Sequence, residues 1–426
     1  MKRILSNRLI LLKQNERTMK KIILIIIISM LAGMDAYSRP QYSLLQSYGT
    51  KCTGCHINTQ GGGVRSFPGW MSRNQSSLVD PSAIGLQGLF DLTQESNQIV
   101  EDKLLYGFDF RYQTARWGSQ SGTSERKHMV MQWSNYLVYT PTDWLTVEGL
   151  YNFGYDIHEV MRYPGQQPGA ASAIIKPSED LPSIRVGYFQ PTIGTKYEDH
   201  TMLNRQIASG RRGVSVVPDD YAELGFQIDY EAISWLGVSF GMFDSKNLSE
   251  TNIPLGASAS GAPMNGNHMS SVFRLVFFPP EIAPGVNAFG GGTLFFNSPL
   301  KTDNGVYFGN EHYYIGNIFF NIGIVDKIAL MTEYMRTVKQ GMLEVNNLTL
   351  ELNYQLLEPL IAYARYERGN TSYTAENAAF ITSHYVLGAK AYILPYIAFL
   401  PEYRINDKEH IPGYASQWAF QIHVFY

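Results

Sequence analysis

From about residue 104 to the end of the chain, apolar and polar side chains alternate with a period of two. In the segment 221–231 the even positions are apolar and the odd positions polar or small; the apolar ones are Leu224, Phe226, Ile228 and Tyr230. The same alternation recurs in 348–356 and 414–426. Because successive side chains of a strand point to opposite faces, each segment predicts a strand with one apolar and one polar face.

About 16 such segments are predicted as strands. They lie at 104–116, 127–140, 143–156, 168–177, 183–191, 221–232, 234–245, 268–279, 285–297, 311–323, 327–338, 345–356, 359–369, 380–393, 395–405 and 413–426. Short links such as Pro141-Thr142 alternate with longer, polar, Gly-rich connections. Bacterial outer-membrane barrels join strands of about ten residues in this way, with short periplasmic turns and long external loops. A β-sandwich also alternates, but its strands average about 5–6 residues. The sequence therefore predicts an all-β transmembrane antiparallel barrel with both ends in the periplasm.

Composition narrows the class of protein. Only 17% of the residues are charged and the net charge is −3, against about 25% charged residues in an average soluble domain. With no long basic run, these values exclude a disordered chain and a nucleic-acid partner. A mean hydropathy of −0.16 and the lack of long apolar runs past residue 40 exclude a polytopic helical membrane protein. Aromatic residues at the strand ends and a terminal Tyr426 are typical of barrels surrounded by outer-membrane lipid.

The N-terminus predicts a cleavable signal peptide over residues 1–38. A lysine pair precedes the apolar run 22–31, and the small-x-small motif Ala36-Tyr37-Ser38 follows it. The alternative is a membrane anchor, but this apolar run is too short to span a bilayer. Met19 is an alternative start, because residues 1–18 add little to the signal. The mature chain is expected to begin near Arg39, in the oxidising compartment outside the inner membrane.

Both cysteines of the chain belong to one motif, Cys52-Thr53-Gly54-Cys55-His56. C-x-x-C-H is the attachment motif of c-type haem, in which two thiols form thioethers and the next histidine binds the iron. The alternatives are a redox C-x-x-C, which needs a βαβ context, and half of a zinc site, which needs a second pair of ligands. The motif therefore predicts one covalent haem c, attached to Cys52 and Cys55, with His56 as the iron ligand.

The haem segment, 39–85, is too short to bury a haem alone, since such small units rarely build an adequate core. We therefore expect the rest of the chain to complete the pocket. Met71 is the nearest downstream candidate for a sixth iron ligand, with His200 and Met202 as further candidates. Methionine or histidine there would suit electron transfer, whereas an open position would suit ligand binding or peroxide chemistry. Met71 is equally compatible with ordinary packing.

The long connection 192–220 predicts a segment folded into the barrel lumen. It carries Arg205, Arg211 and Arg212. These arginines could attract anions, or they could pair with inward-facing carboxylates and hold the loop to the wall. The expected inward carboxylates are Glu223, Asp229 and Glu351.

An exported chain with a single C-x-x-C-H ahead of a barrel of about 16 strands resembles the fused monohaem cytochrome–porins of iron-oxidising bacteria. The stretch 185–191 (RVGYFQP), with Gly194, is similar to phosphate-selective-type porins. The first resemblance implies haem bound by Cys52, Cys55 and His56 and an outer-membrane electron conduit. Its implied partners are an extracellular redox substrate, Fe(II) among them, and a periplasmic c-type cytochrome or other electron carrier.

Four regions are expected: the signal peptide 1–38, the monohaem segment 39–85, a linker or lumen or periplasmic-mouth segment 86–103, and the outer-membrane barrel 104–426. The haem segment is expected on the periplasmic side or in the barrel lumen. No acid–base pair, nucleophile triad or phosphate loop is recognisable, so an electron-transfer protein is expected rather than a conventional enzyme. Two alternatives remain open. One is a passive porin whose haem segment is a plug or sensor, and the other is a haem enzyme with five-coordinate iron.

Overall fold

The structure is a computed structural model of the chain. It describes residues 44–45, 51–58, 63–66, 69–70, 77–93, 97–100, 103–118, 124–154, 168–195, 202–206, 216–217, 221–244, 269–280, 282–297, 313–339, 343–373, 378–408 and 416–426. The predicted signal peptide and the candidate ligands Met71 and His200 lie outside these residues.

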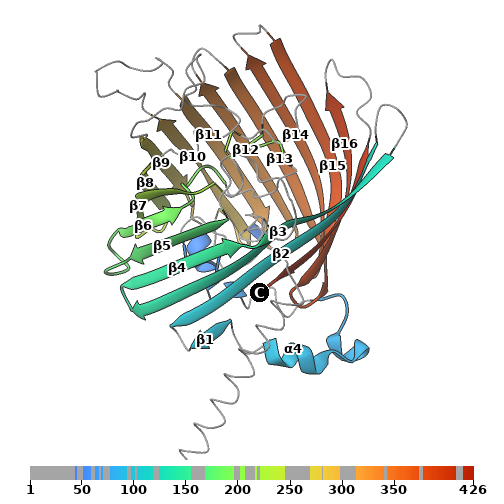
Figure 1. Cartoon of the computed structure of the whole chain (residues 1–426), viewed down its shortest axis with the longest axis horizontal. Coiled ribbons are helices and arrows are strands. Elements are labelled where there is room, and N and C mark those ends of the chain that lie inside the picture. The colour runs from blue at the N-terminus through green and yellow to red at the C-terminus, as the bar shows by residue number, and fades with distance from the viewer. Residues whose placement is uncertain are drawn as a thin grey trace, which may run out of the picture.

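Long antiparallel strands make up most of the fold (Figure 1). The elements before the barrel are η1 (Cys52–Gly54), η2 (Pro81–Ile84), α4 (Gln87–Thr93) and β1 (Gln98–Val100). The barrel strands are β2 (Leu104–Gly118), β3 (Ser124–Thr142), β4 (Leu145–Asn152), β5 (Gly169–Ile175), β6 (Ser183–Phe189), β7 (Glu223–Tyr230), β8 (Leu236–Asp244), β9 (Met269–Phe277), β10 (Val286–Asn297), β11 (Tyr313–Ile324), β12 (Ile328–Lys339), β13 (Leu343–Leu357), β14 (Leu360–Tyr373), β15 (Ala378–Leu394), β16 (Ile397–Lys408) and β17 (Gln417–Phe425).

The sheet closes because the last strand pairs with the first strand of the barrel. Each strand from β2 onward pairs with its sequence neighbour, and β17 pairs antiparallel with β2 from Gln417↔Trp117 to Phe425↔Asp109. The prediction of a closed 16-strand antiparallel barrel is therefore confirmed. Since the number of strands is even, β2 begins and β17 ends at the same end of the barrel. We call this the turn end, because the short connections lie there, and the opposite end the loop end.

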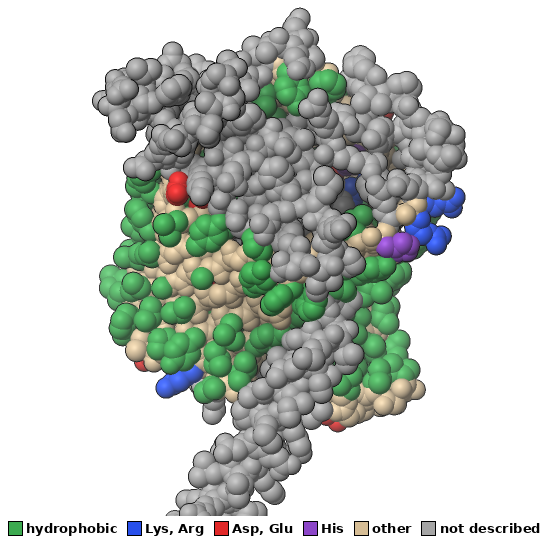
Figure 2. All heavy atoms as spheres, in the orientation of Figure 1, with side chains coloured by type: hydrophobic (Ala, Val, Ile, Leu, Met, Phe, Trp, Pro, Cys, Tyr) green, Lys and Arg blue, Asp and Glu red, His purple; other side chains and the backbone are tan. Residues whose placement is uncertain are grey.

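The alternation along each strand separates an apolar outer wall from a polar interior. On β13, Leu350, Leu352 and Tyr354 are exposed, whereas Thr349 and Glu351 are fully buried in the lumen. Figure 2 shows hydrophobic side chains over the visible wall, with charged side chains near its rims. Such a wall is typical of barrels that cross a membrane. Among the described residues, no helix is both long and apolar enough to span a bilayer.

Exposed aromatic side chains mark both ends of the outer wall, as predicted. Tyr139, Trp144 and Trp235 lie at the turn end, where the ring of Trp235 stacks on Phe277 with 6.3 Å between centroids. Tyr314, Trp418 and other aromatic residues lie near the loop end. Amphipathic rings favour the membrane–water interface, so the two groups delimit the apolar belt.

Some strands extend further toward the loop end than the alternation predicted. The predicted strand 359–369 continues in β14 to Tyr373, where Gly369 pairs with Asn347 and Thr371 with Val345. These last residues are polar on both faces. The strand pairing continues past the apolar belt, where the outer face of a strand no longer needs to be apolar. Residues there do not alternate between apolar and polar, so the sequence pattern did not predict them as strand.

Candidate functional site

The cysteine motif forms a tight turn. The carbonyl of Cys52 accepts the backbone N–H groups of Cys55 (3.1 Å) and His56 (2.9 Å), which closes the one-turn helix η1. Cys52, Cys55 and His56 are all half-buried, and the two cysteines are not joined in a disulfide. A single turn thus presents both thiols and the histidine of the predicted attachment set.

The motif is anchored to the turn between β7 and β8. The ammonium of Lys51 donates to the carbonyls of Glu231 (2.6 Å) and Ile233 (3.1 Å), and the Thr53 hydroxyl donates to the Glu231 carboxylate (3.0 Å). Burial raises the pKa of the Glu231 carboxyl above its ordinary value, and the hydrogen bond from Thr53 opposes this rise. Lys51 also lies over the ring of Phe278, 5.7 Å from its centroid.

The residues after the motif contact the opposite side of the barrel mouth. His56 forms a β-bridge with Arg65, whose guanidinium lies 4.6 Å from the ring centroid of Phe425 on β17. The side-chain amide of Asn97 donates to the Arg65 carbonyl at 2.9 Å. Val64 is buried and packs beside Gly107 of β2. The motif is therefore fixed between two distant parts of the barrel rim.

Residues 51–58 and residues 63–66 with 69–70 form two limbs that lie against each other. Ser66 and Gly69 hold the second limb against the cysteine motif. The Ser66 N–H donates to the Cys55 carbonyl at 3.0 Å, and Gly69 packs directly on the Cys55 backbone. Trp70, which is 2% exposed, then packs on Tyr396 of the β15–β16 turn. Burial raises the pKa of the Cys55 thiol, and the charge of Arg65 opposes this effect.

An earlier part of the chain enters the barrel at the β11–β12 turn. Leu44 and Leu45 are fully buried, and the Leu45 carbonyl accepts the backbone N–H of Asp326 at 3.0 Å. They belong to an apolar cluster inside the wall, together with Met202, Val276, Phe278, Phe289, Phe319, Ala329, Met331 and Ile361. Residues 44–45, 51–58, 63–66 and 69–70, named the N-terminal segment below, thus contact turns around the mouth.

The donor set fits a covalently attached haem c, because two thiols and the following histidine lie on one half-buried turn. Of the candidates for a sixth ligand, Met202 is described. It is 1% exposed and packs among Leu44, Leu45 and the wall, which makes it a packing residue in this structure.

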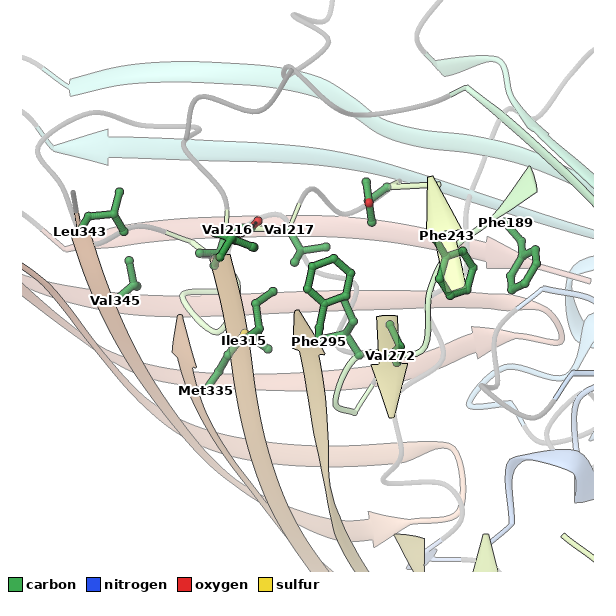
Figure 3. Close-up of a cluster of buried hydrophobic side chains, with 13 residues drawn as sticks. Phe189, Val216, Val217, Phe243, Val272, Phe295, Ile315, Met335, Leu343 and Val345 are labelled. Atoms are coloured by element: carbon green, nitrogen blue, oxygen red, sulfur yellow. Dashed lines mark hydrogen bonds between the residues drawn. The ribbon is translucent and has the colours of Figure 1, made fainter. Parts of the chain in front are cut away.

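The described residues of the connection between β6 and β7 lie in the lumen, as predicted for 192–220. In this lumen loop the Gly194 N–H donates to Thr293 at 3.0 Å, and the Thr195 hydroxyl donates to Glu333. Further along, the Leu203 N–H donates to Glu367 at 3.1 Å. Val216 and Val217 pack among inward side chains of β6 and β8–β13, as Figure 3 shows.

One charged residue of the lumen loop is described. Arg205 donates to the carbonyls of Ile193 and Thr195, and its charge lies near the inward-facing carboxylate of Glu333. Arg211 and Arg212 lie outside the described residues. Glu223, Asp229 and Glu351 face inward as expected, but the partner of Glu351 is Arg365 on β14, at 3.1 Å.

Arg365 is the centre of a buried charge cluster that we did not single out from the sequence. It contacts Glu351, Glu367 and Glu402 at 2.5–3.4 Å, and His384 and Arg404 each contact one of these carboxylates. Odd-numbered residues of the predicted strand 359–369 face inward, so the sequence could have placed Arg365 and Glu367 on the inner face. Strand pairing across β13–β16 was needed to bring the six side chains together.

Comparison with known proteins supports the barrel. No protein-family model matches the sequence, and no curated protein matches it. Among solved structures, OprB of Pseudomonas putida has a TM-score of 0.51 at 9% identity, covering 83% of this chain and 99% of its own. The anion-selective porin of Comamonas acidovorans has a TM-score of 0.51 at 10% identity, covering 76% of this chain and 98% of its own. The likeness is one of fold, and the chain has a porin-type barrel.

Proposed function

We propose that this protein is an outer-membrane barrel that carries one covalent haem c at its periplasmic mouth and transfers electrons there. The turn end is then periplasmic, and the haem is held by Cys52, Cys55 and His56. The observation that carries the proposal is the fixed position of the C-x-x-C-H turn between the β7–β8 turn and the β2–β17 rim.

The residues around the motif would position the haem. Lys51 and Thr53 bind one limb of the segment to the β7–β8 turn, and Ser66 joins the second limb to the Cys55 carbonyl. The bound haem would supply a one-electron redox centre whose potential depends on its axial ligands and burial. The remaining partners are those expected above, a periplasmic cytochrome and an extracellular donor or acceptor such as Fe(II).

Geometry sets a requirement on this function. The hydrocarbon core of a bilayer is about 30 Å thick, so one haem at one mouth cannot carry electrons across it alone. The lumen loop and the N-terminal segment occupy the interior of the barrel. A complete conduit therefore needs a further redox group on the loop side, supplied by the extracellular partner.

The test is spectroscopic and then functional. Purified full-length protein is expected to give a pyridine haemochrome of one haem c per chain, which Cys52→Ala and Cys55→Ala remove while the barrel still assembles. In lipid nanodiscs, the wild type is expected to exchange electrons between its haem and soluble cytochrome c. Absence of covalent haem overturns the proposal. Haem that exchanges no electrons with cytochrome c overturns the electron-transfer role.

A passive channel is the second candidate, favoured by the resemblance of fold to an anion-selective porin. It predicts ion conductance in planar bilayers that is unchanged in Cys52→Ala. The lumen loop, fixed through Thr195 and Glu333, would then narrow the pore. Conductance that depends on haem loading would contradict this alternative.

A further inference from the structure

An exposed apolar surface lies at the turn end, beside the cysteine motif. Four large aliphatic side chains between residues 78 and 89 are 38–51% exposed. They are Leu78, Ile84, Leu86 and Leu89. Figure 1 shows α4 beyond the turn end of the barrel, near the C-terminus. Several exposed aliphatic residues on one short folded segment are a candidate interaction surface.

The segment that carries this surface is fixed to the barrel. The backbone N–H groups of Leu78 and Val79 donate to the carbonyls of Tyr392 and Ile393 at 2.8 and 3.0 Å. Phe90 is buried and stacks on Tyr396, with 6.5 Å between the ring centroids. Phe90 binds α4 to the barrel. The four aliphatic side chains are therefore exposed on a segment whose position is fixed.

The charged residues of the segment itself are acidic. Asp80 and Asp91 are exposed, and residues 77–93 contain no lysine, arginine or histidine. Asp80 caps η2, where its carboxylate accepts the Ser82 N–H at 2.8 Å. Hydrogen bonds from the side chain and then the backbone of Ser82 lower the pKa of Asp80. The carboxylate thus stays ionised over a wide pH range.

Acidic charge decides between two occupants of the surface. Helices that lie on a membrane usually carry Lys and Arg on their polar face, because these attract anionic lipid. Here the charged residues are aspartates, which would repel such lipid and attract a basic protein. A protein partner with a basic rim around an apolar centre fits both the charge and the exposed aliphatic residues.

The surface is also joined by packing to the candidate haem site. Phe90 packs in one cluster with Trp70, Tyr396 and Tyr426. Trp70 follows Gly69, which packs on the backbone of Cys55. A partner bound to α4 would therefore sit close to the cysteine motif.

We propose that Leu78, Asp80, Ile84, Leu86, Leu89 and Asp91, the apolar–acidic patch, form the docking site for a basic, soluble electron-carrier protein. This inference rests on the proposed function, since the haem gives the carrier a reason to bind beside Cys55. It adds the place of docking and the charge of the partner.

The test uses the full chain in lipid nanodiscs and a basic soluble cytochrome c as the probe. Hydrogen exchange of peptides covering 78–93 is expected to slow when the probe is added at low ionic strength. The effect should weaken with salt, because screening reduces attraction between exposed charges. Lysine-acetylated cytochrome c, which has lost its positive charge, should have no effect.

Variants assign the binding to the patch. Asp80→Asn with Asp91→Asn is expected to weaken binding about 2- to 30-fold, the range for the loss of two exposed charge pairs. The matched control is Glu179→Gln with Asp180→Asn in the β5–β6 turn, two exposed acids at the same end, which should leave binding unchanged. Equal weakening by both pairs would overturn the proposal.

The apolar part is tested in the same way. Leu86→Ser with Leu89→Ser should weaken binding, whereas Leu181→Ser, an exposed leucine at the same end, should not. Residues 78–93 could exchange more slowly in nanodiscs than in detergent and show no change when the probe is added. That result would mean that lipid covers the patch, and it would overturn the proposal. A pyridine haemochrome measured on the same sample separates failure of the haem proposal from failure of docking, since exchange reports binding with or without haem.

Discussion

Gly69→Ala is the sharpest perturbation of the candidate haem site. A Cβ at this position would lie 2.6 Å from both the Cα and the carbonyl carbon of Cys55, and closer still to its oxygen. Ordinary carbon–carbon contacts are about 3.5–4.0 Å. The two limbs of the N-terminal segment must therefore separate by about 1 Å at Cys55 for the substitution to fit.

The size of the effect follows from two contributions. Overpacking a tight contact costs about 1–3 kcal/mol. Separation of the limbs also weakens the hydrogen bond from Ser66 to the Cys55 carbonyl, which contributes about 0.5–1.5 kcal/mol. Together they destabilise the docked segment by about 1.5–4.5 kcal/mol, which corresponds to a local opening about 10- to 1,600-fold more frequent.

Hydrogen exchange of peptides covering 51–70 measures this opening, and haemochrome content measures its effect on haem attachment. Exchange should accelerate in that range, and haem content should fall, while the barrel keeps its heat-modifiable mobility on gels. Gly88→Ala is the control, because a Cβ there meets no atom within 4 Å and alanine favours the helix. Unchanged exchange at 51–70 in Gly69→Ala would refute the packing argument.

Three further predictions concern the motif, the lumen and the wall. Burial raises the pKa of Glu231 in the folded state, so this group's contribution to the stability of the fold should be greatest below pH 4.5, the ordinary value, and be lost as pH rises through the raised pKa. Exchange measured against pH should show this slope, and Glu231→Gln should remove it. Gly194→Ala would force a Cβ onto Glu333 at a positive φ, so the lumen loop should detach and single-channel conductance rise. Gly316→Ala adds a Cβ at an ordinary contact distance of 3.9 Å from Leu294 and should leave conductance unchanged. Arg365→Met leaves its buried glutamates without their cation and should lower the free energy of unfolding by about 3–5 kcal/mol in urea titrations in lipid vesicles. An unchanged urea midpoint would contradict the assigned role of Arg365.

The local turn of the candidate site was predictable from the sequence, and the contacts around it were not. Cys52, Cys55 and His56 are adjacent in sequence, so their spacing alone indicates the turn that η1 forms. Their anchors are distant: Glu231 is 178 positions from Thr53, and Phe425 lies at the end of the last strand. No local pattern links such residues, because their contact depends on the closure of the barrel.

The charge cluster shows the same limit within the wall. Parity places Glu351 and Arg365 on inner faces, but the register Glu351↔Arg365 of β13 and β14 makes them opposite each other. Register depends on how many residues each turn takes up, and a shift of one residue would reverse the faces.

The sequence by itself determined the barrel, its strand number and the turn that the C-x-x-C-H motif forms, because alternation of period two and C-x-x-C-H are local patterns. The tertiary structure alone decided what fills the lumen and the mouth: the β6–β7 connection pairs with Glu333 and Glu367, and Leu44 and Leu45 insert at the β11–β12 turn. These positions arise from packing between segments far apart in the chain, whose free energy depends on the closed shape of the barrel rather than on any one stretch of residues.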